Sequence, residues 1–166
     1  MDSAQALAAP ALRPCLALSV EVGAPIEVGP SASPLGHGHR RVIPIIGGQV
    51  LCEHASGAWS GRVLPGGADF QLIVAGRAAR LEARYVIETD AGDRIYVENQ
   101  ALRSGPPELV ARLARGEPVD PALIYFRCLP RFETAAPALA WLMERLFVGT
   151  GARHPERVAL RVFELA

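Results

Sequence analysis

The feature that most constrains the fold of this chain is a series of short strand-like runs separated by Gly, Pro and Asp. In residues 16–22, Leu16, Leu18 and Val20 alternate with more polar neighbours, a pattern typical of a half-buried strand. Similar runs follow at residues 41–46, 49–54, 61–64, 70–75, 81–89, 94–101, 123–134, 138–148 and 157–165. This spacing predicts an all-β fold, an antiparallel β-barrel of roughly eight to ten strands.

The segments outside these runs complete the predicted domain organisation. Residues 1–11 lack a periodic pattern and are expected to form a flexible N-terminal tail, with a single barrel domain over residues 12–166. Residues 23–38 are rich in Pro, Gly and Ser and are expected to form a long loop. Residues 106–116 begin with two prolines and end at Gly116, which predicts one short helix over a mouth of the barrel or against its wall.

The pattern around Asp90-Ala91-Gly92 predicts the register of a hairpin. If these residues form a three-residue loop with Gly92 in the left-handed conformation, residues whose numbers sum to 182 face each other. Arg84 then lies opposite Glu98 on the outer surface. The predicted inward set is Leu81, Ala83, Tyr85, Ile87, Ile95, Val97, Asn99 and Ala101. Tyr85 and Asn99 are its two polar members and are therefore candidate ligand-binding residues.

The basic residues exclude several classes of function. All 17 are arginine, and the formal net charge is zero. Without lysine the chain forms no Schiff base with pyridoxal phosphate and has no P-loop. A neutral balance argues against a nucleic-acid partner and gives no reason to expect membrane binding. No cofactor motif is recognised, so we expect no cofactor and a small-molecule ligand as the partner.

Three cysteines, Cys15, Cys52 and Cys128, are widely spaced and odd in number. They are expected to be buried apolar residues in a reducing compartment. The N-terminus lacks the basic start of a signal peptide, and no apolar run is long enough to span a bilayer. We therefore expect a cytoplasmic protein, and a homodimer because two-fold dimers are the commonest assembly.

Asp69 is the first candidate for catalysis. It follows Pro65-Gly66-Gly67, a turn whose glycines allow close approach of the backbone to another group. One interpretation is structural, with Asp69 accepting hydrogen bonds from backbone N–H groups of the turn. In the other, Asp69 faces the barrel interior, where low polarity raises its pKa and suits it to proton transfer.

The run at residues 125–133 provides the second set of candidates. One face carries Tyr125, Arg127, Arg131 and Glu133, and the other carries apolar residues and Pro130. If the apolar face is the core, the arginines lie in water. If the barrel is wide enough to hold a ligand, Arg127 binds a carboxylate or enolate oxygen and Glu133 is a second catalytic candidate. Pro130 could also mark a bulge that reverses the alternation.

A metal site is not predicted. His37 and His39 lie in a glycine-containing loop followed by two arginines, and no third or fourth ligand is apparent. We expect these histidines to be exposed to solvent.

Several motifs together resemble the uncharacterised family called domain of unknown function 3237, also described as UPF0311. The motifs are residues 42–45 (VIPI) with Gly47-Gly48, 63–70 (VLPGGADF), 82–85 (EARY), 95–99 (IYVEN), 125–127 (YFR) with 130–134 (PRFET), 141–142 (WL) and 147–151 (FVGTG). The resemblance extends over nearly the whole chain in a consistent order.

The resemblance implies a calycin-like or avidin-like β-barrel and no assigned activity. It also suggests Trp141 and the position of Met143 as ligand-binding candidates. Two residues depart from the family pattern: Phe70 stands where Trp is more usual, and Met143 stands where Asn is expected. If that Asn lines the pocket, its absence removes a hydrogen-bonding group.

Three functions are therefore weighed. The first is a cofactor-independent isomerase, cyclase or lyase acting on a small, mostly apolar molecule, with Asp69 or Glu133 moving a proton and Tyr85, Asn99 and Arg127 orienting the substrate. The second is a non-catalytic binding protein using the same residues. The third is an interaction module whose barrel is filled by its own side chains.

Overall fold

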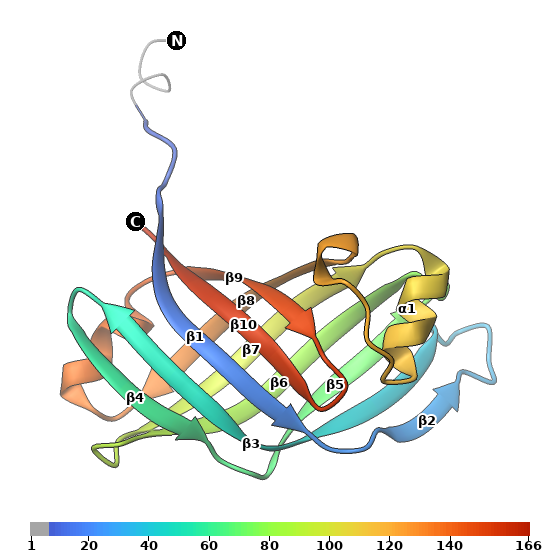
Figure 1. Cartoon of the computed structure of the whole chain (residues 1–166), viewed down its shortest axis with the longest axis horizontal. Coiled ribbons are helices and arrows are strands. Elements are labelled where there is room, and N and C mark those ends of the chain that lie inside the picture. The colour runs from blue at the N-terminus through green and yellow to red at the C-terminus, as the bar shows by residue number, and fades with distance from the viewer. Residues whose placement is uncertain (1–6) are drawn as a thin grey trace.

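A computed structural model describes residues 7–166 and confirms the predicted all-β barrel (Figure 1). Ten strands form one sheet, in which each paired strand runs antiparallel to its neighbours. The strands are β1 (Leu12–Val22), β2 (Ile26–Pro30), β3 (His39–His54), β4 (Gly57–Val63), β5 (Gly67–Val74), β6 (Ala78–Thr89), β7 (Arg94–Ser104), β8 (Tyr125–Thr134), β9 (Phe147–Arg153) and β10 (Arg157–Leu165). The helical segments are α1 (Pro107–Ala114) and two 3-10 segments, η2 (Pro121–Leu123) and η3 (Pro137–Met143).

Pairing of β1 with both β10 and β3 closes the sheet into a barrel with eight strand positions around its wall. Two strands, β4 and β5, together occupy one of these positions. Both β4 and β5 lie between β3 and β6, β4 pairing with the second half of β3 and β5 with the first half. The remaining strand, β2, extends the sheet by pairing with the start of β3. Closure leaves few free sheet edges and encloses the inward-facing side chains.

The β6–β7 hairpin has the predicted register. Arg84 pairs with Glu98 and Glu88 with Arg94, and Gly92 has a φ of 91°. All eight residues of the predicted inward set are buried or packed against the core. Seven belong to or contact the hydrophobic core, and the eighth, Asn99, is a buried polar residue. The alternation therefore predicted both faces of this hairpin correctly, because a one-residue shift would have exposed the entire apolar set.

In β3, two runs predicted as separate strands form one. The runs 41–46 and 49–54 are joined through Gly47-Gly48, where the pairing with β1 shifts by one residue between Glu21 and Val22. Gly48 has a φ of 138°, and a Cβ there would lie 2.2 Å from the backbone oxygen of Ser19. The glycines thus let one strand continue across β1 with a bulge.

Three other segments differ from the sequence-based prediction. The run 138–148 was predicted as a strand, but Pro137–Met143 is a 3-10 helix whose buried residues Leu139 and Leu142 are three apart, as that helix requires. The predicted loop at 23–38 contains the short strand β2. The strand predicted from residue 123 begins at Tyr125, after η2. Part of the predicted flexible tail, residues 1–6, lies outside the described residues.

The two ends of the barrel differ. Figure 1 shows α1 at one end, on the right, whereas η3, the pale orange-red coil on the left, lies at the opposite end. At the η3 end Trp141 stacks on His54 with 3.9 Å between ring centroids, and Phe132 meets Phe147 edge to face. These aromatic side chains pack together at the η3 end, where His54 also pairs with Glu164 at 3.0 Å.

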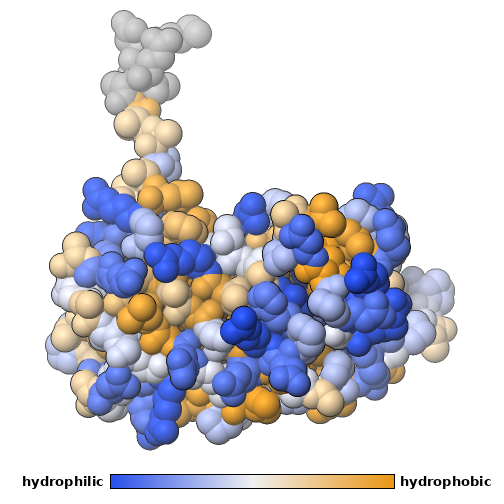
Figure 2. All heavy atoms as spheres, viewed as in Figure 1, coloured by the Kyte–Doolittle hydropathy of each residue, from blue (hydrophilic) through white to orange (hydrophobic). Residues whose placement is uncertain are grey.

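The outer surface is mixed in polarity. Figure 2 shows hydrophilic and hydrophobic residues interspersed over one face of the barrel. Within residues 7–166, no helix combines the length and the apolar character that crossing a membrane would need. The three cysteines are all free and buried, as predicted.

Candidate functional site

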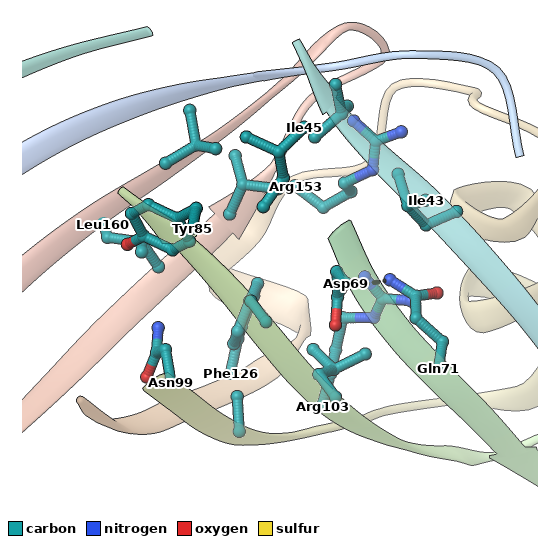
Figure 3. A pocket seen from close by; sticks show the side chains of 16 residues that line it. Ile43, Ile45, Asp69, Gln71, Tyr85, Asn99, Arg103, Phe126, Arg153 and Leu160 are labelled. Carbon is teal, nitrogen blue, oxygen red and sulfur yellow. Dashed lines mark hydrogen bonds between the residues drawn. The ribbon is translucent and has the colours of Figure 1, made fainter. Parts of the chain in front are cut away.

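The candidate site is a cavity inside the barrel, toward the α1 end (Figure 3). Its volume is about 40 Å³, room for a few water molecules. The lining residues come from eight strands: Val20, Val22, Ile43, Ile45, Asp69, Gln71, Leu81, Ala83, Tyr85, Asn99, Ala101, Arg103, Phe126, Arg153, Val158 and Leu160. Most are aliphatic, and the polar ones form two groups.

The first polar group is a chain of hydrogen bonds centred on Gln71. Its Nε2 donates to Oδ2 of Asp69 at 2.6 Å, and its Oε1 accepts from Nε of Arg41 at 2.9 Å. Arg41 is buried and also donates from Nη1 to the carbonyl oxygen of Ala114 at 2.9 Å. This last bond ties the C-terminal end of α1 to the barrel.

Arg103 completes this group from β7, and Figure 3 shows its side chain close to Asp69 and Gln71. It is only 2% exposed, yet its Nε and Nη2 atoms have no hydrogen-bond partner among the described residues. Its guanidinium lies 5.9 Å from the ring centroid of Phe126. Burial, with the positive charge of Arg41, lowers the pKa of Arg103 to about 10, so the side chain remains charged at neutral pH.

Arg153 stands where the cavity meets the outside. Together with Val22 it lines both the cavity and an outer groove beside the C-terminal end of α1. Its Nη1 atom donates to the carbonyl oxygens of His154 and Arg157, within its own hairpin. The linings of the cavity and of the outer groove therefore meet at Val22 and Arg153.

The carboxyl group of Asp69 lies in an environment that disfavours its charge. Burial raises the pKa of Asp69, while the hydrogen bond from Gln71 and the charge of Arg103 partly offset this rise. The Oδ1 atom is enclosed and has no hydrogen-bond partner in the described part of the chain. A carboxyl group with a raised pKa and an unpaired oxygen facing a cavity can exchange a proton with a bound molecule.

Tyr85 and Asn99 form the second polar group, farther along the cavity (Figure 3). Burial raises the pKa of Tyr85, so its hydroxyl is a neutral hydrogen-bond donor at physiological pH. Burial also raises the pKa of the nearby Cys128 thiol, to about 11. The Oδ1 atom of Asn99 is buried without a partner within residues 7–166. The Asn99 oxygen thus offers unused hydrogen-bonding capacity to a molecule in the cavity, which Tyr85 also lines.

A glycine of the turn before Asp69 positions this wall of the cavity. A Cβ on Gly67 would lie 2.5 Å from the backbone oxygen of Arg84 and 2.6 Å from Cβ of Tyr85. The predicted close approach of the backbone therefore occurs between the start of β5 and Tyr85. It brings Asp69 and Tyr85 to one side of the barrel.

The remaining predicted site residues lie away from this cavity. Arg127 and Glu133 are exposed on the outer face of β8, whose alternation continues through Pro130 without a register shift. Trp141 belongs to the aromatic cluster at the η3 end, and Met143 is 50% exposed. His39 begins β3, with Nε2 2.5 Å from Oε2 of Glu27.

Three polar lining residues, Gln71, Arg103 and Arg153, were not predicted, and neither was Arg41, which donates to Gln71. The feature of the sequence that could have identified them is the alternation of inward-facing and outward-facing positions along each strand. Arg103 continues the set of alternate residues through Asn99 and Ala101, and Gln71 is in phase with Asp69. Because charged residues at strand ends are usually exposed, the phase alone did not identify them.

The fold and site together define a small closed antiparallel barrel with a mainly apolar interior and a cationic end. The chain belongs to the family described as "Protein of unknown function (DUF3237)", whose model matches residues 10–165. A UPF0311 protein of Rhodopseudomonas palustris is 53% identical over 135 residues, which cover 81% of this chain and 86% of that protein.

Solved structures agree with this assignment. A conserved protein of unknown function from Rhodopseudomonas palustris superimposes with a TM-score of 0.85 at 44% identity, covering 96% of this chain and 99% of that one. An enzyme from Penicillium herquei has a TM-score of 0.67 at 16% identity, with coverage of 96% and 97%. At that identity the likeness shows the fold alone.

Proposed function

We propose that the protein binds a small organic molecule inside the barrel and that Asp69 transfers a proton on it without a cofactor. Isomerisation, cyclisation and addition–elimination are the reactions that such a step serves. The observation that carries the proposal is that Asp69, Asn99 and Arg103, each with an unpaired polar atom, converge with Tyr85 on one mainly apolar cavity.

The cavity volume favours the alternative of a filled barrel. About 40 Å³ is far below the roughly 300 Å³ of common ligand pockets. The polar atoms argue against a merely structural interior, because an unpaired buried charge destabilises a fold by several kcal/mol, on the order of the total stability of many domains. A very small ligand, with some movement of the long Arg103 and Arg153 side chains, reconciles the small cavity with the unpaired polar atoms.

Catalysis is favoured over simple binding by the state of Asp69. A carboxylate that only held a ligand would work best fully charged, with a lowered pKa. Burial instead raises the pKa of Asp69, which is the direction that favours acid–base chemistry. The fold is compatible with catalysis, since the Penicillium herquei protein that shares it is described as an enzyme. Non-catalytic binding by the same residues is the second candidate. The predicted cytoplasmic location and homodimer stay predictions.

The binding step is tested with 2-butanone, a small neutral ketone, titrated into the full chain and followed by backbone NMR. We expect saturable shifts along β6 and β7. The variant Ala101→Leu fills the cavity and should weaken binding about ten-fold or more, because it removes the space the probe occupies. Ala58→Leu, at an exposed position of β4, is the matched control and should bind normally. Absence of saturable interior shifts would favour the filled barrel.

The proton-transfer step is tested with the same ketone in deuterium oxide. Asp69 would remove an α-proton to give an enolate and return a deuteron, so deuterium should enter the ketone faster than in buffer alone. Asp69→Asn should reduce this exchange to the buffer rate while leaving 2-butanone bound. Equal exchange in both proteins would remove Asp69 from the mechanism.

A further inference from the structure

The strongest unexplained feature of the cavity is the unpaired edge of Arg103. The side chain is 2% exposed, and both Nε and Nη2 are enclosed without a hydrogen-bond partner among residues 7–166. These two nitrogens lie on the same edge of the planar guanidinium. Their N–H groups therefore point in parallel toward one missing acceptor, in the fork geometry that binds two oxygens of a carboxylate.

The other cations near the cavity have acceptors. Arg41 donates to Gln71 and Ala114 and lies 3.8 Å from a carboxylate oxygen of Glu27. Arg153 donates to backbone carbonyl oxygens of its own hairpin. Arg103 thus differs from its two neighbours in having a whole edge without a partner.

The charges around the polar end do not balance. Three guanidinium groups, of Arg41, Arg103 and Arg153, lie near the carboxyl group of Asp69, the one carboxyl group that lines the cavity among residues 7–166. Counting Glu27 as the partner of Arg41 still leaves one positive charge in excess. An excess positive charge in an enclosed region destabilises the folded protein unless an anion enters, because surroundings of low polarity screen charge weakly.

We infer that the natural ligand is a small carboxylate with an apolar body, its two oxygens paired with Nε and Nη2 of Arg103. This rests on the proposed function and specifies the ligand class of the same site. The apolar body would lie against the aliphatic walls from Ile45, Leu81 and Leu160, and within reach of Tyr85 and Asn99. The junction at Val22 and Arg153 would admit the anion past a second positive charge.

The test compares butyrate with butyramide, its neutral counterpart of the same shape, in NMR titrations of the full chain. Butyrate should bind about 10- to 100-fold more tightly, the value of a charge-assisted bidentate pair. Arg103→Met, similar in length but uncharged, should abolish this preference while keeping butyramide binding within a few-fold. Arg127→Met, on the outer face of β8, is the matched control and should retain the preference.

The outcomes separate the two proposals. Equal binding of both probes to the native protein, or a preference that survives in Arg103→Met, would overturn the carboxylate inference and leave the binding site standing. If neither probe nor 2-butanone gives saturable interior shifts, the binding function itself fails. Should Arg103→Met not fold, Arg103→Lys keeps the charge without the fork and should weaken butyrate about ten-fold; unchanged butyrate affinity in that variant would also overturn the inference.

Discussion

Gln71 and Asp69 are joined by a hydrogen bond of 2.6 Å from the Gln71 amide to the Asp69 carboxyl group. Because Oε1 of the same amide accepts from Arg41, the orientation of Gln71 is determined: Nε2 must point to Asp69. The neutral side chain of Gln71 thereby connects Arg41, the buried cation bonded to the end of α1, to Asp69, the carboxyl group proposed to transfer protons.

Replacing Gln71 by Leu should raise the pKa of Asp69 further, because the hydrogen bond from Gln71 is the main influence holding that pKa down. It should also destabilise the protein by about 1–3 kcal/mol, since Nε of Arg41 loses its acceptor. Carbon-13 NMR titration of the Asp69 carboxyl group and urea unfolding measure the two effects. Gln100→Leu, at an exposed position of β7, should change neither. An unchanged Asp69 pKa would show that Gln71 does not control it.

Arg103→Met should stabilise the ligand-free protein by about 1–4 kcal/mol, because it removes a buried charge whose Nε and Nη2 lack partners. Chemical denaturation of both proteins measures the difference. The control Arg127→Met concerns an exposed side chain and should stay within about 0.5 kcal/mol of the native value. A large loss of stability in Arg103→Met alone would mean that the guanidinium supports the fold.

Asp69→Asn should have a pH-dependent effect on stability. The raised pKa means that the folded state holds the Asp69 proton more tightly than the unfolded state does. Below the ordinary value of 3.8 the carboxyl group is neutral in both states and imposes no penalty. As pH rises from there through the folded-state pKa, the native protein should lose stability relative to Asp69→Asn, and the difference should then level off.

Urea unfolding of both proteins at a series of pH values measures this difference directly, since contributions of other groups cancel in the subtraction. A difference that changed in the opposite direction, with the native protein gaining on the variant as pH rises, would mean that the arginines outweigh burial at Asp69.

Gly67→Ala should destabilise the barrel by about 1–3 kcal/mol, because the added Cβ overlaps the backbone oxygen of Arg84 and Cβ of Tyr85. Thermal or urea unfolding measures the loss, and shifts of the Tyr85 ring signals should accompany it. Gly23→Ala is the matched control: its nearest neighbours would lie 3.5 Å away, so it should be neutral or slightly stabilising. Equal effects of the two changes would contradict the role of close approach.

The sequence predicted the barrel and much of its wall. Alternation over residues 81–101, with Gly92 at the turn, determined the β6–β7 register and the inward placement of Tyr85 and Asn99. That inference succeeds from sequence because strand pairing through a tight turn is local, and a shift of one residue would expose every apolar side chain. The prediction of a strand at Pro137–Met143 was wrong because a short apolar run does not distinguish a strand from a 3-10 helix.

By itself, then, the sequence determined the family, the antiparallel barrel and the local inward faces, since these depend on alternation, turn residues and motifs along the chain. Only the tertiary structure decided which polar side chains meet. Asp69 and Gln71 on β5, Arg103 on β7, Arg41 on β3 and Arg153 on β9 share one end of the barrel through its closure, and Arg127 and Glu133 are turned outward. That grouping depends on which distant strands become neighbours when the sheet closes, and alternation within each strand carries no record of it.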